Sequence, residues 1–268
     1  MKSLLRTFLL VGALGALLSV PAFAQDDPIT VLDSGRLLVF SDNRVVAVED
    51  FDFSLQADSI TISSAMQRKA HGANGAELEM KKHMALVVSA VDFGMRSYIS
   101  NYEFDGHTTV QGVIPGDTVM TVYTERDGGG SADRLVQPPG RLFVMDPGLF
   151  TLFDVICHSL KGKTFTKRPV QIIALADPAQ AVEATITVVG ADTVVWGGRP
   201  TPVKRLKFED PSGEFAVWID GASRMLRLEH AQSGLVVMRE APQAPAPPKK
   251  KAAAPGRKPA AKKPAGAR

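Results

Sequence analysis

The segment Val203–Glu229, VKRLKFEDPSGEFAVWIDGASRMLRLE, decides the expected fold. It contains three short runs of the β-branched, aromatic and aliphatic side chains that favour strands, separated by two turns. In the run FAVWI at 215–219, alternate side chains point to opposite faces, with Phe, Val and Ile on one face and Ala and Trp on the other. DPSG at 210–213 and DG at 220–221 supply the turn residues. The segment therefore predicts the closing meander of an antiparallel sheet.

Strand-like runs of the same kind fill most of the chain before this segment. Between residues 29 and 123, short β-branched or aromatic runs alternate with turn residues such as Asp105-Gly106, and similar runs resume from residue 169 to residue 197. We therefore expect a mainly β protein, with an antiparallel, strongly curved sheet or incomplete barrel of about ten strands. The glycines at 128–130 are expected to form a flexible loop.

One segment has the pattern of a helix. Asp146 can act as the N-cap, Pro147 as the first helical residue and Gly162 as the stop signal. Most residues between them are apolar and form a wide face that can be buried. The remaining stripe is polar and consists of Thr151, Asp154 and His158. The sequence predicts one α-helix over residues 147–160, packed against the concave or open side of the sheet.

The only cysteine of the chain, Cys157, cannot form a disulfide within it. In the predicted helix Cys157 lies on the apolar face, and the side chain of His158 projects roughly 100° away around the helix axis. A nucleophilic thiol needs an adjacent base and a partly exposed, electropositive setting. We therefore interpret Cys157 as a buried structural residue.

The first 24 residues have the features of a secretory signal peptide. Lys2 and Arg6 precede an apolar run at 8–18, and Ala22-Phe23-Ala24 forms an A-x-A cleavage pattern. The run is shorter than the roughly 20 residues of a membrane-spanning helix, which argues against an uncleaved anchor. We predict cleavage after Ala24 and a periplasmic or secreted protein with one β-rich globular domain over residues 25–240.

Residues 241–268 form an Ala/Pro/Lys-rich basic tail that we expect to be disordered, because it has no large apolar side chain to bury. Of the 31 Lys and Arg residues, two precede residue 25 and eight follow residue 240, which leaves 21 against all 28 acidic residues. The basic tail therefore follows an acidic domain. It could bind an anionic cell-envelope surface, keep the protein soluble without binding a partner, or fold back on the acidic domain. Export argues against nucleic acid as its partner. The candidate anion-binding residues are Lys249, Lys250, Lys251, Arg257, Lys258, Lys262 and Lys263.

No motif indicates an enzyme or a metal centre. The five histidines are scattered, without H-E-x-x-H or H-x-H, and no G-x-S-x-G elbow occurs. We expect no catalytic residue, no metal ligand and no cofactor, although a site built from sequence-distant residues would leave no motif. Trp196, Trp218 and the phenylalanines could line a lipid-carrying cavity or fill the core between sheet and helix. Strand alternation fits both readings, and we favour core filling.

The C-terminal half resembles a group of uncharacterised bacterial exported proteins of unknown function, whose sheets are similar to the LolA/LolB-type lipoprotein-carrier half-barrel. The resemblance rests on a turn-then-helix segment at 140–160, a strand ending at 185–197 and a final hairpin at 215–239 that contains W-x-D and R-x-L-R-L-E. It implies a β half-barrel that handles a hydrophobic envelope ligand. It carries over no catalytic residue, and the basic tail departs from it.

Three functions are compatible with the sequence. The first is a non-catalytic envelope protein that binds a lipid or another apolar ligand in its curved sheet, which predicts a lined cavity instead of a solidly packed interior. The second is an interaction module that docks to anionic envelope components through the basic tail. The third is an enzyme whose site is invisible in the sequence, which requires a pocket with converging polar groups and a shifted pKa.

Overall fold

A computed structural model of the protein describes residues 27–71 and 77–242. These residues form one antiparallel-rich sheet of 15 strands and one short helix, α1. The elements are β1 Thr30–Ser41, β2 Arg44–Gln56, β3 Ser59–His71, β4 Glu77–Ser89, β5 Met95–Phe104, β6 His107–Ile114, β7 Val119–Arg126, β8 Gly129–Val136, β9 Leu142–Met145, α1 Thr151–Ser159, β10 Lys167–Ala174, β11 Gln180–Trp196, β12 Arg199–Asp210, β13 Gly213–Ile219, β14 Met225–His230 and β15 Leu235–Arg239. Among the described residues, no helix has the length and hydrophobicity needed to cross a bilayer.

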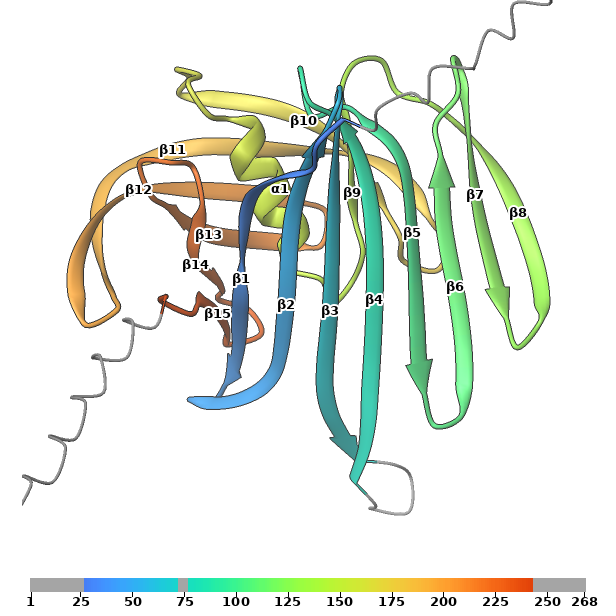
Figure 1. Ribbon diagram of the computed structural model, residues 1–268, viewed down its shortest axis with the longest axis horizontal. Helices are drawn as coiled ribbons and strands as arrows, with labels where there is room; N and C mark the ends of the chain where they lie inside the picture. Colours follow the sequence, from blue (N-terminus) through green and yellow to red (C-terminus); the bar gives the residue numbers. More distant parts are fainter. Residues whose placement is uncertain (1–26, 72–76, 243–268) are drawn as a thin grey trace, which may run out of the picture.

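The strand order is β8-β7-β6-β5-β4-β3-β2-β1-β15-β14-β13-β12-β11-β10-β9, so two meanders meet where β1 pairs with β15. All neighbouring pairs are antiparallel except β9 and β10, which are parallel. The sheet curves strongly around α1, and its two halves face each other across the helix (Figure 1). It does not close into a barrel, because β8 and β9 remain as edges. This confirms the predicted mainly β fold with a curved sheet and one packed helix.

The sheet has more strands than the expected number of about ten. The clearest error is β8, where Gly129 and Gly130 were predicted to form a loop and instead pair with Arg126 and Glu125 of β7. Asp127 and Gly128, with φ of 49° and 83°, make the turn alone. Nearly all of β8 is exposed, so this edge strand has no buried face that would impose an alternating pattern.

Helix α1 is shorter than predicted and has a different environment. It begins at Thr151, not at Pro147, because Gly148 adopts a φ of 87°, which lies outside the helical region. Asp146 is therefore not its N-cap, and Phe150 occupies that position. Thr151 and Asp154, predicted on a polar stripe facing away from the core, are fully buried. The reason is that the curved sheet surrounds the helix instead of covering one side of it.

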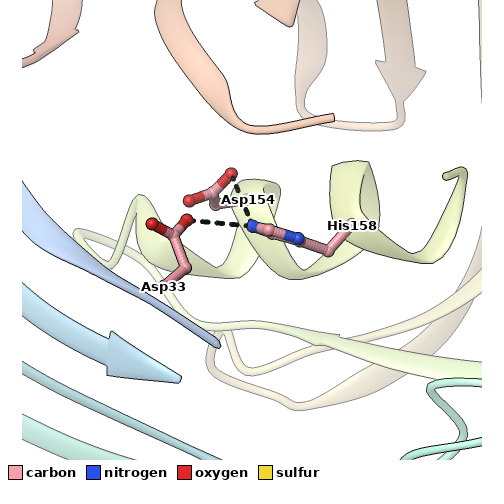
Figure 2. Close-up of side chains that lie close together, drawn as sticks. All are labelled: Asp33, Asp154 and His158. Atoms are coloured by element: carbon pink, nitrogen blue, oxygen red, sulfur yellow. Dashed lines mark hydrogen bonds and ion pairs between the residues drawn. The ribbon is translucent and has the colours of Figure 1, made fainter. Parts of the chain in front are cut away.

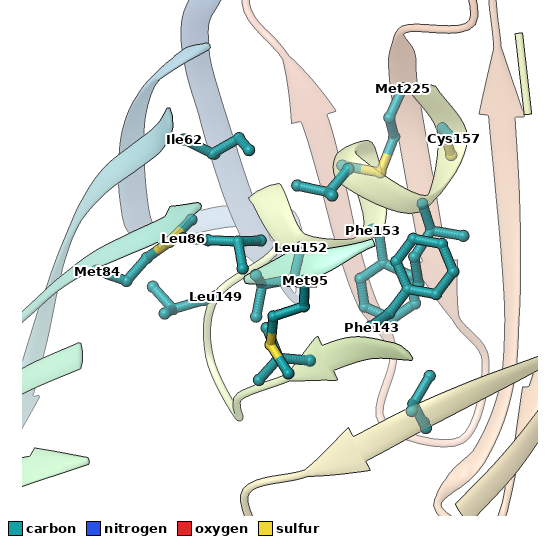
Figure 3. Close-up of a cluster of buried hydrophobic side chains, with 14 of the residues drawn as sticks. Ile62, Met84, Leu86, Met95, Phe143, Leu149, Leu152, Phe153, Cys157 and Met225 are labelled. Atoms are coloured by element: carbon teal, nitrogen blue, oxygen red, sulfur yellow. The ribbon is translucent and has the colours of Figure 1, made fainter. Parts of the chain in front are cut away.

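The main hydrophobic core lies around α1. Leu152 and Phe153 of the helix are almost fully buried. Phe153 contacts the rings of Phe208 and Phe215, with centroid distances of 5.3 and 4.9 Å. Figure 3 shows side chains of both sheet halves gathered around the helix, among them Ile62, Met84, Leu86, Met95 and Met225. Phe153, Phe208 and Phe215 thus fill the space between sheet and helix, as the core-filling interpretation predicts.

The two tryptophans lie in a separate cluster. Trp218 alternates with Val217 and Ile219 along β13, so it occupies the opposite face from the main core. It packs with Val203 and Leu226, next to Trp196. Neither tryptophan lines the large cavity described below.

Candidate functional site

A buried carboxylate of β2 caps the start of α1. Glu49 is fully buried and accepts hydrogen bonds from the backbone N–H of Phe150 at 2.7 Å, the N–H of Thr151 at 3.3 Å and the hydroxyl of Ser64 at 2.6 Å. The first N–H groups of a helix lack partners within the helix and carry partial positive charge, so a carboxylate satisfies both. Burial raises the pKa of Glu49, although these hydrogen bonds act in the opposite direction. Glu49 therefore positions the helix from the sheet.

A second buried carboxylate fixes the loop before the helix. Asp146 forms an ion pair with Lys82 and accepts hydrogen bonds from the hydroxyls of Tyr98 and Ser100, the latter at 2.8 Å. The Lys82 ammonium also donates to the carbonyl of Pro147 at 3.1 Å. Burial, followed by the nearby charge of Asp146, raises the pKa of Tyr98 well above its usual range. These bonds hold the loop against β4 and β5.

A third cluster joins β1, α1 and β15. Figure 2 shows Asp33 and Asp154 converging on the imidazole of His158, whose Nε2 lies 3.1 Å from Asp33 Oδ2 and 3.8 Å from Asp154 Oδ1. The buried guanidinium of Arg239 donates to both carboxylates, at 2.8 Å to Asp33 and 2.6 Å to Asp154. Asp154 also accepts the backbone N–H of Met225 at 2.7 Å. The cluster therefore ties the helix to the strand pair where the two meanders meet.

The two carboxylates of this cluster have opposite pKa shifts. Burial alone would raise the pKa of Asp33, but the hydrogen bonds from His158 and Arg239 lower it to about 2 from its ordinary 3.8. Burial raises the pKa of Asp154, which is completely enclosed, against the opposing charge of Arg239. As the pH rises, Asp33 therefore loses its proton before Asp154 does.

The donor set of Asp33, Asp154 and His158 has the chemical type of a metal site, with candidate ligand atoms within 4.8 Å of one another. Both carboxylates, however, already form ion pairs and hydrogen bonds with Arg239. A cation here would have to displace a buried guanidinium that also stacks on the ring of Phe51 at 4.7 Å. The arrangement is that of a buried ion-pair cluster that connects α1 with β1 and β15.

We predict opposite pH dependences for Asp33 and Glu49. The stability that Asp33 contributes is complete above its ordinary pKa of 3.8 and is lost as the pH falls towards 2. Folded Glu49 holds its proton more tightly than the unfolded chain does, so stability is lost as the pH rises from 4.5 through the folded-state pKa. Urea unfolding across the acidic range should show the advantage of wild type over Asp33→Asn increasing with pH. The advantage over Glu49→Gln should decrease with pH, and parallel curves would contradict these environments.

A cavity of about 1250 Å³ lies beside the helix. One wall is the concave side of β1–β8, and the opposite wall consists of the loop before α1, the loop at 175–179 after β10 and the turn between β14 and β15. The paired Lys82 and Asp146 form part of its boundary. Asp146, Pro147, Gly148 and Phe150 of the loop before α1 line the cavity, whereas none of residues 151–159 does.

The remaining predicted site residues have different outcomes. The tail residues proposed to bind anions, Lys249 to Lys263, lie outside the described residues, and their role stays a prediction. Cys157 is a buried free cysteine, and burial raises the pKa of its thiol, which confirms the structural interpretation. Of the described histidines, His158 was not expected to join a carboxylate cluster.

The buried charged residues were missed by motif searching, but the strands contain a signal for them. Glu49 has the same strand parity as the buried Phe51, and Lys82 the same parity as the buried Met84. Likewise, Arg239 has the parity of the buried Val237. A charged residue at an inward position requires a buried partner, since an unpaired charge there is costly. Its partner, however, cannot be read from the strand.

Comparison with known proteins finds one similar solved structure. No protein-family model matches the chain, and no curated protein matches it. Among solved structures, the chain is similar to the β-barrel-like protein of domain of unknown function DUF1849 from Brucella abortus. The match covers 79% of this chain and 97% of that one, with 7% sequence identity and a TM-score of 0.49.

Proposed function

We propose that the protein is a non-catalytic, exported envelope protein that binds a lipid or another apolar molecule inside its curved sheet. The observation that carries this proposal is the cavity of about 1250 Å³, because a solidly packed interior would have argued against a carrier or binding role. Pockets for small ligands usually measure about 300–1,000 Å³, so the space is sufficient for an elongated molecule. The periplasmic or secreted location is part of the proposal and is supported by the signal-peptide pattern of residues 1–24.

The wall formed by the first four strands is suited to an apolar chain. Val39, Ala47, Met66 and Met80 line it from β1, β2, β3 and β4. Phe150, Leu175 and Leu235 contribute apolar groups from the opposite wall. An apolar ligand placed between these surfaces would remove both from water, which is the main source of free energy for such binding. Methionine adds adaptability, because its flexible thioether fits ligands of different shape.

The positions of the shifted titratable groups favour binding over catalysis. Burial raises the pKa of Glu49, Asp154 and Cys157, and none of the three lines the cavity. Glu49 and Asp154 are engaged in bonds that hold α1 in place. Acid–base catalysis needs such a group within reach of the substrate, so these residues support the fold instead.

The proposal predicts that a charge in the apolar wall weakens binding. Met80→Glu or Leu235→Glu should lower the affinity for dansyl-labelled undecanoic acid by at least about tenfold, since a carboxylate would have to be desolvated against the bound chain. Both native side chains are partly exposed, so the variants should fold, which circular dichroism can verify. Fluorescence titration measures the affinity.

The matched control is Ile99→Glu, which introduces the same charge on the outer face of β5, where Ile99 is 44% exposed. Its affinity should equal that of wild type. Native mass spectrometry of protein purified without detergent should also show a co-purified apolar ligand that Met80→Glu loses. Absence of both probe binding and co-purified ligand in wild type would refute the proposed function.

A further inference from the structure

The cavity wall changes character from β4 to β8. Beyond β1–β4, the side chains that face the cavity from β5–β8 are mostly hydroxyl and amide groups; Val122 is apolar, and Arg126 and Asp133 are charged. This polar set consists of Tyr102, Thr109, Gln111, Thr124 and Ser131. The strand register makes its members neighbours, because Tyr102 pairs with Thr109 and Thr124 pairs with both Gln111 and Ser131. They therefore form a continuous patch across four strands.

No side chain of the polar set forms a hydrogen bond with another part of the chain that the structure describes. Cross-strand neighbours lie close enough to interact, yet these five groups remain available to a ligand. Each of them can both donate and accept hydrogen bonds. In contrast, the adjacent Ser100 on β5 is already bonded to Asp146. The polar set thus presents unused, uncharged hydrogen-bonding groups next to an apolar wall.

The charges around the cavity balance and do not form an anion site. Its boundary contains three basic side chains, Arg68, Lys82 and Arg126, and three acidic ones, Asp133, Asp146 and Asp177. Lys82 and Asp146 neutralise each other directly. On β7 and β8, Arg126 is offset by Asp133 and by the neighbouring Asp127, whose pKa it helps to lower. A phosphate or carboxylate would find no convergent set of cations here.

One aromatic ring borders the polar set. The ring of Tyr102 stacks on that of Phe104, with a centroid distance of 6.4 Å and an interplanar angle of 26°. This contact supports the ring beside Thr109 and Gln111 and gives the patch a flat apolar surface as well as a hydroxyl. Uncharged polyols such as sugars combine hydroxyl groups with apolar C–H faces, so a patch of this composition complements both.

We infer that the cavity takes an amphiphile with an uncharged, hydroxyl-rich headgroup, which lies against the polar set on β5–β8 while the apolar chain lies along β1–β4. This inference rests on the proposed function and specifies its ligand class. The shared chemistry is that of a polyol, and the headgroup could be a sugar or a glycerol.

Four probes with the same twelve-carbon chain test the headgroup: dodecyl maltoside, glycerol monolaurate, laurate and dodecylphosphocholine. Calorimetric titration below their micelle-forming concentrations should show at least one of the two polyol probes binding about tenfold more tightly than laurate, the ratio expected from one or two additional hydrogen bonds. The two polyol probes distinguish a sugar from a glycerol headgroup. Equal affinities, or tightest binding of laurate or dodecylphosphocholine, would overturn the inference while leaving the proposed function intact. Failure of all four probes would overturn both.

Side-chain variants locate the effect. The double variant Gln111→Leu with Thr124→Val keeps the approximate volume of both side chains but removes their hydrogen-bonding groups. It should lose the roughly tenfold preference for the polyol probe and keep its laurate affinity. The matched control is Thr121→Val, the same change on the same strand; Thr121 is next to the inward-facing Val122, so strand alternation places it on the outer face. A control that loses the preference, or a double variant that keeps it, would contradict the assigned headgroup position.

Discussion

Replacing Arg239 with Leu is expected to lower the free energy of unfolding by about 3–5 kcal/mol, the usual cost of leaving buried charges without their partner. The guanidinium forms ion pairs with both Asp33 and Asp154, and its own side chain is only 3% exposed. Its loss would leave the carboxylates of Asp33 on β1 and Asp154 on α1 buried without their cation. Water could replace the lost hydrogen bonds only if the structure opened. Chemical denaturation monitored by tryptophan fluorescence would measure the change.

The matched control for this variant is Arg36→Leu. Arg36 forms an ion pair with Asp50 at 2.7 Å on the neighbouring strands β1 and β2, but both side chains are about half exposed. Exposed ion pairs contribute little, so the control should remain close to wild type. In the Arg239→Leu background, Asp33→Asn combined with Asp154→Asn should restore part of the stability, because the amides remove the uncompensated charge. Equal effects of the two arginine variants would show that the buried cluster has no special role.

Phe153→Ala should have an effect of similar size, about 3–5 kcal/mol, because it removes a large buried ring from the core. Phe153 is 5% exposed and contacts Phe208 and Phe215, so it joins the helix to β12 and β13. The cavity that it would leave cannot collapse easily, since α1 is also held from the other half of the sheet by Glu49. The free energy of unfolding, measured by urea denaturation, tests this expectation.

Two comparisons make the Phe153 result specific. Phe153→Leu retains much of the apolar volume and should cost less than about 1.5 kcal/mol. Val189→Ala removes an apolar group from a side chain that is 55% exposed, and should change stability by no more than about 0.5 kcal/mol. If Phe153→Ala were as mild as Val189→Ala, the helix would not depend on the aromatic contact for its attachment.

Strand alternation was a reliable guide at 215–219, where Val217 and Ile219 face the main core and Trp218 faces away from it. The segment Val203–Glu229 forms most of β12, all of β13 and most of β14, with the turns at the predicted positions. The prediction was wrong for β8, because an exposed edge strand satisfies its backbone on one side only and needs no apolar face. It was also wrong for the start of α1, where the local sequence indicated Asp146 as the N-cap. In the structure Asp146 is paired with Lys82, and the distant Glu49 caps the helix instead.

The candidate site was predicted only as a choice between a cavity and a filled core, and both are present. Phe153, Phe208 and Phe215 fill the core around α1, while a separate space, lined in part by Phe150, remains on the side of β1–β8. Nothing in the spacing of Tyr102, Gln111 and Thr124 indicates that they meet, because they belong to three different strands. Their proximity follows from the register of antiparallel pairing, and that register depends on turns and buried neighbours throughout the sheet.

The sequence by itself determined the mainly β class, the two faces of the strand at 215–219 and the presence of one helix between sheet segments. These properties depend on residues that are close together in the sequence, because the two-residue period of a strand and the chemistry of turns are local. The tertiary structure alone decided that Glu49 caps α1, that Arg239 joins Asp33 to Asp154 and that a cavity remains beside the helix. The physical reason is that buried charge pairing and unfilled volume depend on how distant strands are brought together, and the curvature of the whole sheet sets that arrangement.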